Sequence, residues 1–245
     1  NKKLKERVGK FFCMEKFYVT TPIYYLNAEP HIGHAYTTIA ADILARFHRL
    51  KERKVFFLTG TDEHGEKNQR IAKEKGMDVK EYVDQMAEKF REAWKKLNIS
   101  FDDFIRTTEK RHEEVVKKLI KKLWENGDIY KGYYEGIYCV GCESFKTESE
   151  LVNGKCPDHP NLELEKIKEE TYFFKLIKYK EKRIEIFSKI VILPEKRKRE
   201  IINRLKGELK DLCIARPKER VGWGIEFPID KNFTVYVWLD ALPNY

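Results

Sequence analysis

Two histidines bracket a glycine in the segment Pro30-His31-Ile32-Gly33-His34. The segment lies between an apolar run at 17–25 and a stretch with helical periodicity that begins at Ala35. The N–H groups and the dipole at the start of a helix favour an anion, and imidazoles can donate hydrogen bonds to phosphate oxygens. Gly33 would let a ligand or the backbone approach closely. The pattern predicts a site for nucleotide phosphates, and a structural role for the two histidines is the alternative.

A second candidate site consists of two ligand pairs, Cys139-Val140-Gly141-Cys142 and Cys156-Pro157-Asp158-His159. Three thiolates and one imidazole can close a tetrahedral site that suits Zn²⁺. The Asn153-Gly154 pair predicts the return turn between them. Because protein ligands fill all four positions, the metal would be structural. The alternatives are two unrelated pairs or a redox-active Cys-x-x-Cys motif.

The composition is that of a globular protein with a basic surface. The chain has 245 residues, 42% hydrophobic and 36% charged, and can bury one large core, or one core with a small satellite. Its net charge of +9 suits a polyanion such as nucleic acid, although a solvated Lys- and Glu-rich surface would carry the same charge. No window approaches the ~20 apolar residues of a membrane span, which predicts a cytoplasmic protein without a membrane partner. Cys13 and Cys213 have no evident partner and are predicted to be ordinary thiols.

Strand and helix patterns alternate over residues 17–106. The predicted strands are 17–25, 55–59 and 101–106. One helix is predicted from 35 to 51, a second from the polar loop at 60–65 to residue 75, and a third after Asp78, which would cap it. This alternation predicts a parallel sheet with right-handed crossovers. The polar loops after the first two strands would then meet at one edge of the sheet, where open α/β sheets bind ligands.

The pattern changes at about residue 128. Aromatic, glycine-spaced segments predict antiparallel strands, and two charged helices are predicted at 179–190 and 195–209. Residues 235–239 return to a buried-strand pattern and are predicted to rejoin the first sheet. The fold class predicted is therefore α/β, with a parallel sheet interrupted by an insertion.

Several motifs, in order, resemble those of methionyl-tRNA synthetases, which are class I aminoacyl-tRNA synthetases. Two segments resemble the opening of that family, Thr20-Thr21-Pro22-Ile23-Tyr24-Tyr25-Leu26-Asn27 and Pro30-His31-Ile32-Gly33-His34-Ala35-Tyr36. A third resembles its second-strand loop, Thr59-Gly60-Thr61-Asp62-Glu63-His64-Gly65. The cysteine pairs resemble its zinc knuckle. Lys210-Asp211-Leu212-Cys213-Ile214-Ala215-Arg216-Pro217 is similar to its Asp-Leu-Ser-Ile-Ser-Arg segment, with two serines replaced, and Tyr236-Val237-Trp238-Leu239-Asp240-Ala241 through Tyr245 resembles its amino-acid pocket strand.

The resemblance implies a Rossmann-like, doubly wound parallel sheet interrupted by an α+β zinc-binding (connective peptide) domain. We expect an N-terminal extension at 1–13 and the first half of the catalytic domain at 14–115. The insertion would occupy 116–230, with the zinc knuckle at about 136–162. Residues 231–245 would begin a truncated second half.

The activity implied is ATP-dependent formation of methionyl-adenylate, followed by transfer of methionine to the 3′ end of tRNA(Met). The implied cofactor is one structural Zn²⁺, with ATP and Mg²⁺ as substrate. The implied partners are L-methionine, ATP, tRNA(Met), and a second polypeptide or the missing C-terminal half.

The resemblance also assigns roles to individual residues. His31 and His34 would be catalytic and would bind ATP with Gly33. Arg216 would give electrostatic support, and His64 is interpreted as ordering its loop. The metal ligands would be Cys139, Cys142, Cys156 and His159. The methionine pocket would comprise Ile23, Tyr25, Asp62, Trp238, Ala241 and Tyr245.

Two parts of the family pattern are absent from the sequence, the Lys-Met-Ser-Lys-Ser loop and the helical anticodon-binding domain. We therefore expect this polypeptide alone to be a fragment that binds zinc and activates methionine weakly or not at all. The alternatives are another class I synthetase, of the leucyl, isoleucyl or cysteinyl type, or a non-catalytic zinc-containing tRNA-binding fragment.

Overall fold

The structure is a computed structural model that describes residues 15–142, 144–146 and 148–245. The expectations for the N-terminal extension and for Cys13 lie outside these described residues. The chain divides into two compact units, the first made of the residues up to Glu114 together with Asp240–Tyr245, and the second of Val115–Leu239. We describe each unit by itself.

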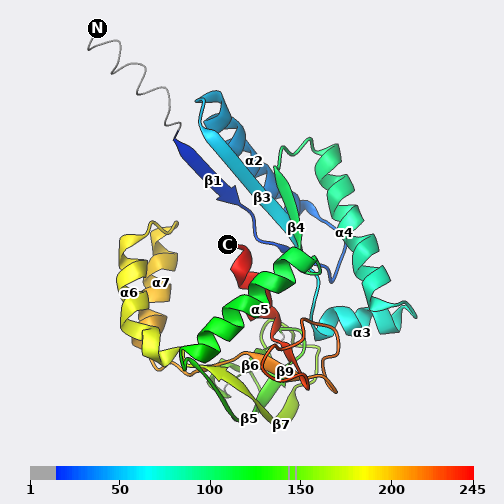
Figure 1. Cartoon of the computed structure of the whole chain (residues 1–245), viewed down its shortest axis with the longest axis vertical. Helices are drawn as coiled ribbons and strands as arrows, with labels where there is room; N and C mark the ends of the chain where they lie inside the picture. The colour runs from blue at the N-terminus through cyan, green and yellow to red at the C-terminus, as the bar shows by residue number, and fades with distance from the viewer. Residues whose placement is uncertain (1–14, 143, 147) are drawn as a thin grey trace. The chain divides into compact units, whose positions relative to one another are not determined.

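The first unit contains the predicted parallel sheet (Figure 1). Its central strand, β3 (Lys54–Asp62), pairs with β1 (Lys16–Thr20) and β2 (Tyr24–Tyr25) on one side and with β4 (Asp103–Arg106) on the other, all in parallel. The predicted first strand is thus two short strands. Pro22, which has no N–H group to give to a ladder, lies at the break between them.

The helices of the first unit are α2 (Ile32–Leu50), α3 (Glu66–Glu74), α4 (Val79–Lys96) and the start of α5 (Lys110–Glu125). The helix predicted from 35 begins three residues earlier, at Ile32, whereas the caps predicted at Asp78 and Gly76 are confirmed. Asp78 caps α4, because its Oδ1 accepts hydrogen bonds from the N–H groups of Lys80 and Glu81 at 2.9 and 3.1 Å. Gly76 follows α3 with φ +65°, a conformation that glycine adopts without strain. Helix α2 packs on β1 and β3.

The second unit is built on an antiparallel sheet in the order β6-β5-β7-β8. The long strand β5 (Ile129–Cys139) pairs with β7 (Glu165–Phe174) along nearly its whole length. The other strands, β6 (Ser144–Lys146) and β8 (Leu212–Cys213), are short, and β9 (Ala215–Pro217) pairs with β10 (Phe233–Val235) in a separate ribbon. Helices α6 (Lys180–Lys189) and α7 (Glu195–Lys206) pack on each other.

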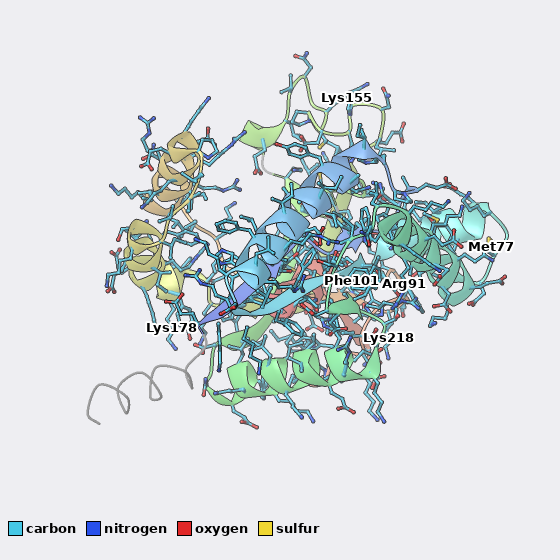
Figure 2. The ribbon with its side chains drawn as sticks, turned by 90° about the horizontal axis from the view of Figure 1, so that it is seen from above. Met77, Arg91, Phe101, Lys155, Lys178 and Lys218 are labelled. Carbon is cyan, nitrogen blue, oxygen red and sulfur yellow. The ribbon has the colours of Figure 1, made fainter. Side chains whose placement is uncertain are left out.

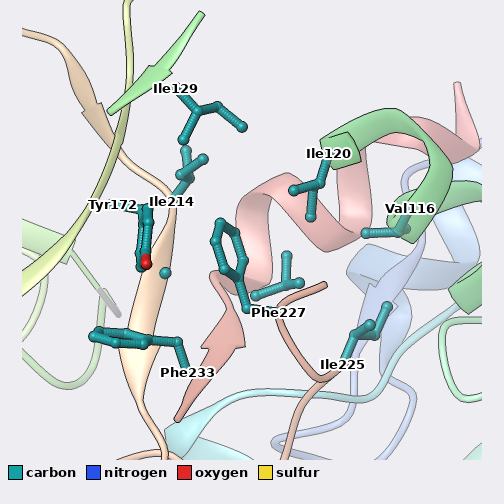
Figure 3. Packing of buried hydrophobic residues seen from close by; sticks show 10 residues of the cluster. Val116, Ile120, Ile129, Tyr172, Ile214, Ile225, Phe227 and Phe233 are labelled. Carbon is teal, nitrogen blue, oxygen red and sulfur yellow. The ribbon is translucent and has the colours of Figure 1, made fainter. Parts of the chain in front are cut away.

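The core of the second unit lies where α5 meets the segment that follows β8 (Figure 3). Val116 and Ile120 of α5 are fully buried against Ile214, Ile225 and Phe227. This burial explains why the face of α5 that carries these two residues is apolar. The same cluster contains aromatic residues from two strands, Tyr172 and Phe233.

The prediction that 235–239 is a strand of the first sheet is wrong. Val235 ends β10, which pairs with β9 in the second unit, and the chain then turns into the short helix α8 (Val237–Ala241). A short apolar run fits a buried strand and a buried helix equally well, and tertiary contacts decide between them. Here the N–H of Tyr236 donates to the carbonyl of Ile214, 2.9 Å away, and Leu239 N–H donates back to Tyr236 to start the helix.

Among the described residues, none of the helices combines the length and the apolar character that crossing a membrane requires.

Candidate functional site

His31 and His34 form a reciprocal cap at the start of α2. The Nδ1 atom of His31, the N-cap residue, accepts a hydrogen bond from Gly33 N–H at 3.1 Å, and His34 Nδ1 accepts one from His31 N–H at 3.2 Å. The two rings stack with their centroids 3.8 Å apart. A ring nitrogen that accepts a hydrogen bond carries no proton, so each neutral ring carries its proton on Nε2. The cap thus prepares two N–H donors beside the positive end of a helix dipole.

The electrostatics of this cap favour the neutral form of His34. Partial burial, followed by the neighbouring His31, lowers the pKa of His34 from its ordinary value of 6.5. Gly33 allows the close geometry, since a Cβ there would lie 2.9 Å from Cε1 of His31. The group that comes close to Gly33 is therefore the ring of His31, whereas the sequence analysis expected a ligand or the backbone there.

Four of the residues assigned to the amino-acid pocket come together within the first unit. Ile23 and Ala241 pack in one buried cluster with Leu58 and Ile105, and the N–H of Ile23 donates to the Tyr245 hydroxyl at 2.9 Å. Burial raises the pKa of Tyr245, the bond from Ile23 opposes this, and the charge of Asp62 adds to it. The charge of the Asp62 carboxylate thus acts on the hydroxyl of Tyr245.

Tyr25 lies beside Asp62 because β2 and β3 pair in register at these two residues. Both residues stand at the carboxyl ends of parallel strands, the edge at which open α/β sheets bind ligands. The resulting arrangement has apolar side chains, a phenol and one carboxylate at the same edge.

A charged network that the sequence did not reveal fixes the residue after Asp62. Glu63 is fully buried and accepts hydrogen bonds from Arg106 Nε at 2.6 Å, Arg106 Nη2 at 2.8 Å, and the Thr61 and Thr108 hydroxyls at 2.7 and 2.6 Å. Burial opposes the charge of Arg106, but Glu63 and Asp84 raise the pKa of Arg106. The loop after β3 is therefore held rigidly. Its only sequence signal was the position of Glu63 next to Asp62.

A second network of the first unit joins three distant segments. Asp240 accepts from His64 Nδ1 at 2.6 Å and from His112 Nε2 at 2.6 Å. All three side chains are buried. No local pattern predicts this cluster, because the partners are far apart in the sequence.

Two predicted site residues, Trp238 and Arg216, belong to the second unit. Trp238 lies on α8 and is half exposed. Arg216 is buried, donates to Cys213 Sγ at 2.9 Å, and lies over the ring of Tyr236, 4.2 Å from its centroid. Burial works against its charge, but Cys213 and two tyrosines raise the pKa of Arg216, so the guanidinium stays charged.

The four predicted metal ligands lie together in the second unit. Their ligand atoms are all within 4.8 Å of one another, so the cluster is a candidate metal site. Cys142 Sγ is 3.5 Å from Cys156 Sγ and 3.3 Å from His159 Nδ1, which in turn is 3.8 Å from Cys139 Sγ. A tetrahedral Zn²⁺ with ordinary bond lengths would place sulfur atoms about 3.8 Å apart and sulfur–nitrogen pairs about 3.6 Å apart. The donor set and its spacing fit this ion.

The knuckle backbone is shaped for this approach. Asn153 and Gly154 have φ of +52° and +74°, which makes the predicted return turn, and Lys155 after it is labelled in Figure 2. A Cβ at Gly141 would lie 2.5 Å from the ring of His159. Burial, and then the Cys156 and Cys139 thiols, raise the pKa of Cys142 to about 12, so a bound cation would have to displace that proton.

Comparison with known proteins identifies the family. The sequence profile of the family "tRNA synthetases class I (M)" matches residues 17–164 and 160–245. The chain belongs to the class I (M) tRNA synthetases. The match spans every described residue that the motifs assigned to the site.

Individual members of this family are similar over almost the whole chain. A methionine–tRNA ligase of Caldanaerobacter subterraneus is 54% identical over 231 residues, which are 94% of this chain and 36% of that protein. One from Thermotoga maritima is 47% identical over 236 residues, with 94% and 37% covered. The chain thus spans about a third of the length of these curated relatives.

Solved structures of the family have the same fold. The structure of Mycobacterium tuberculosis methionyl-tRNA synthetase in complex with methionyl-adenylate is 42% identical, with a TM-score of 0.89 and coverage of 95% of this chain and 46% of that one. The apo form of the same enzyme is 38% identical, with a TM-score of 0.77 and coverage of 95% and 45%. The Rossmann-like parallel sheet and the antiparallel insertion are therefore shared with these structures, and in this chain the insertion carries the Cys₃His cluster.

Proposed function

We propose that this chain is part of a methionine–tRNA ligase, and that its first unit carries residues that bind ATP and L-methionine. The full-length protein would form methionyl-adenylate and then charge tRNA(Met), whereas this chain alone would activate methionine weakly or not at all. The observation that carries the proposal is the family match, which includes all the residues assigned to the site. Because tRNA charging accompanies translation, we expect the protein to act in the cytoplasm.

Each group would have a part in the reaction. The methionine carboxylate would attack the α-phosphate of ATP, which is bound with Mg²⁺, and negative charge would build on the phosphate oxygens. The Nε2–H groups of His31 and His34, prepared by the cap, would donate to those oxygens. Asp62 would pair with the substrate ammonium. Tyr25, Ile23, Ala241 and Tyr245 would surround the thioether, which favours polarisable aromatic neighbours.

The remaining assigned residues belong to the second unit. Trp238 would complete the methionine pocket, and Arg216 would give electrostatic support. Cys139, Cys142, Cys156 and His159 would hold one Zn²⁺. The ion would supply a structural cross-link, because its four positions are filled by protein.

Methionine-dependent exchange of pyrophosphate into ATP by the full-length protein tests this function. Asp62→Asn is expected to raise the KM for methionine by about 10- to 100-fold, the value of a lost charge-assisted hydrogen bond. His31→Ala is expected to lower kcat by about 100-fold, the effect of losing one donor to a developing charge. Assays with leucine, isoleucine and cysteine in place of methionine decide between synthetase types. Exchange that is equally fast with one of these amino acids would overturn the proposal.

A further inference from the structure

One buried carboxylate connects two of the three segments that carry residues assigned to the amino-acid pocket. Asp240 is completely buried and belongs to α8, one residue before Ala241. Its Oδ2 accepts from His64, two residues after Asp62, and its Oδ1 accepts from His112 on α5. The loop of Asp62 and the segment of Ala241 and Tyr245 therefore share a single anchoring group.

The chemistry of the cluster makes this anchor stiff. Burial raises the pKa of Asp240, but the hydrogen bonds from His112 and His64 outweigh it and lower the pKa below its ordinary value. An ionised carboxylate accepts only, so His64 must carry a proton on Nδ1 and His112 on Nε2. Both oxygens of the carboxylate are thereby satisfied. Removing either donor would leave part of a buried charge unpaired, which is strongly unfavourable.

The anchored segments make contacts that a small shift would disturb. The Tyr245 hydroxyl accepts from the N–H of Ile23, and Ala241 packs on Ile23. The charge of Asp62 acts on the phenol of Tyr245. A displacement of α8 relative to the loop after β3 would change the distance between the carboxylate that holds the ammonium and the side chains that enclose the thioether.

We propose that Asp240 is a positioning residue for methionine, which sets the Asp62 loop against Ala241 and Tyr245 through its bond to His64. The inference rests on the proposed function and goes beyond it, because none of the three residues of this cluster is among those assigned to the substrates. Asp240 acts through its neighbours and touches no reacting atom.

The test uses His64, because its side chain offers a conservative replacement. The amide nitrogen of asparagine reaches nearly the position of the imidazole Nδ1, so His64→Asn keeps a donor to Asp240, whereas His64→Ala removes it. In the full-length protein we expect His64→Ala and Asp240→Asn to raise the KM for methionine on the order of 10-fold, as a misplaced binding group does, with the KM for ATP changed less than about 2-fold. His64→Asn is expected to restore the KM for methionine toward the wild-type value.

A buried aspartate of the second unit provides a matched control. Asp128 is 1% exposed and accepts from Lys178 and Tyr179 at 2.5 and 2.7 Å, with Lys178 labelled in Figure 2. Asp128→Asn should lower the melting temperature without changing the KM for methionine selectively. An equal rise in both KM values for His64→Ala, or no rescue by His64→Asn, would overturn the positioning role. Wild-type exchange that does not depend on methionine would instead overturn the proposed function.

Discussion

The protonation of the His34 ring is linked to the stability of the histidine cap at the start of α2. Its Nδ1 accepts a hydrogen bond in the folded protein, and its pKa is below 6.5. The unfolded chain therefore binds a proton more readily than the folded chain as the pH falls through 6.5. The contribution of this residue to stability is complete above about pH 6.5 and is lost as the pH falls toward the lower folded value.

We predict that His34→Gln makes the free energy of unfolding less dependent on pH between about pH 5 and pH 6.5. Glutamine at the third helical position can accept from the N-cap N–H, so the cap is kept while the titration is removed. Denaturant unfolding at a series of pH values measures this. His48→Gln is a positive control and should reduce the pH dependence in the same direction, since burial, and then Arg53 and Lys51, lower the pKa of His48 too. If the free energy of unfolding of His34→Gln depended on pH as steeply as that of the wild type, the prediction would be contradicted.

At the scale of the element, the beginning of α2 depends on the absence of a side chain at Gly33. A Cβ there would displace the His31 ring and remove the bond from Gly33 N–H, which costs about 1 kcal/mol. Alanine is also the better helix former by a similar amount. For Gly33→Ala we therefore predict a nearly unchanged free energy of unfolding. The rate of methionine-dependent pyrophosphate exchange into ATP by the full-length protein should fall about 10-fold, because one hydrogen-bond donor is misplaced.

Gly76→Ala is the reciprocal control. Gly76 has φ +65°, and a Cβ added there would meet no heavy atom within 4 Å, so alanine costs about 1 kcal/mol through the backbone alone. The pyrophosphate-exchange rate of Gly76→Ala should stay at the wild-type level. If Gly33→Ala lost stability and kept its exchange rate, the cap would be structural only.

The hydrophobic period predicted α2 but not the face that it buries. Ile43, Phe47 and Leu50 are 60%, 48% and 84% exposed, whereas Ala41 and Ala45 pack against the sheet. Small side chains let the helix approach the strands closely, and the sequence pattern weights bulky residues more heavily. The caps at Asp78 and Gly76 were predictable because each depends on a few neighbouring residues, but the histidine cap of α2 was not predicted.

At the scale of the whole molecule, the sequence predicted groups that are contiguous and missed groups that the fold assembles. The two histidines and the cysteine pairs are readable because their spacing is local. The contacts of Asp240 with His64 and His112, and of Glu63 with Arg106, join residues far apart in the chain. Such partners are set by strand order and helix packing, which periodicity alone does not fix.

The metal and the core of the second unit should stabilise different parts of that unit. The knuckle contains short strands and turns, whereas Ile120 and Phe227 belong to an apolar cluster that includes none of the four ligands.

We predict that a strong chelator makes the three cysteines of the site reactive toward a disulfide reagent, because the freed thiols are no longer shielded by a cation. Hydrogen exchange should rise at about 139–159 and stay unchanged around Ile120 and Phe227. Cys213→Ser serves as the control, since the gain in reactive thiols should be the same as in the wild type. Loss of protection around Ile120 and Phe227 at the same chelator concentration would show that the ion holds the whole unit together.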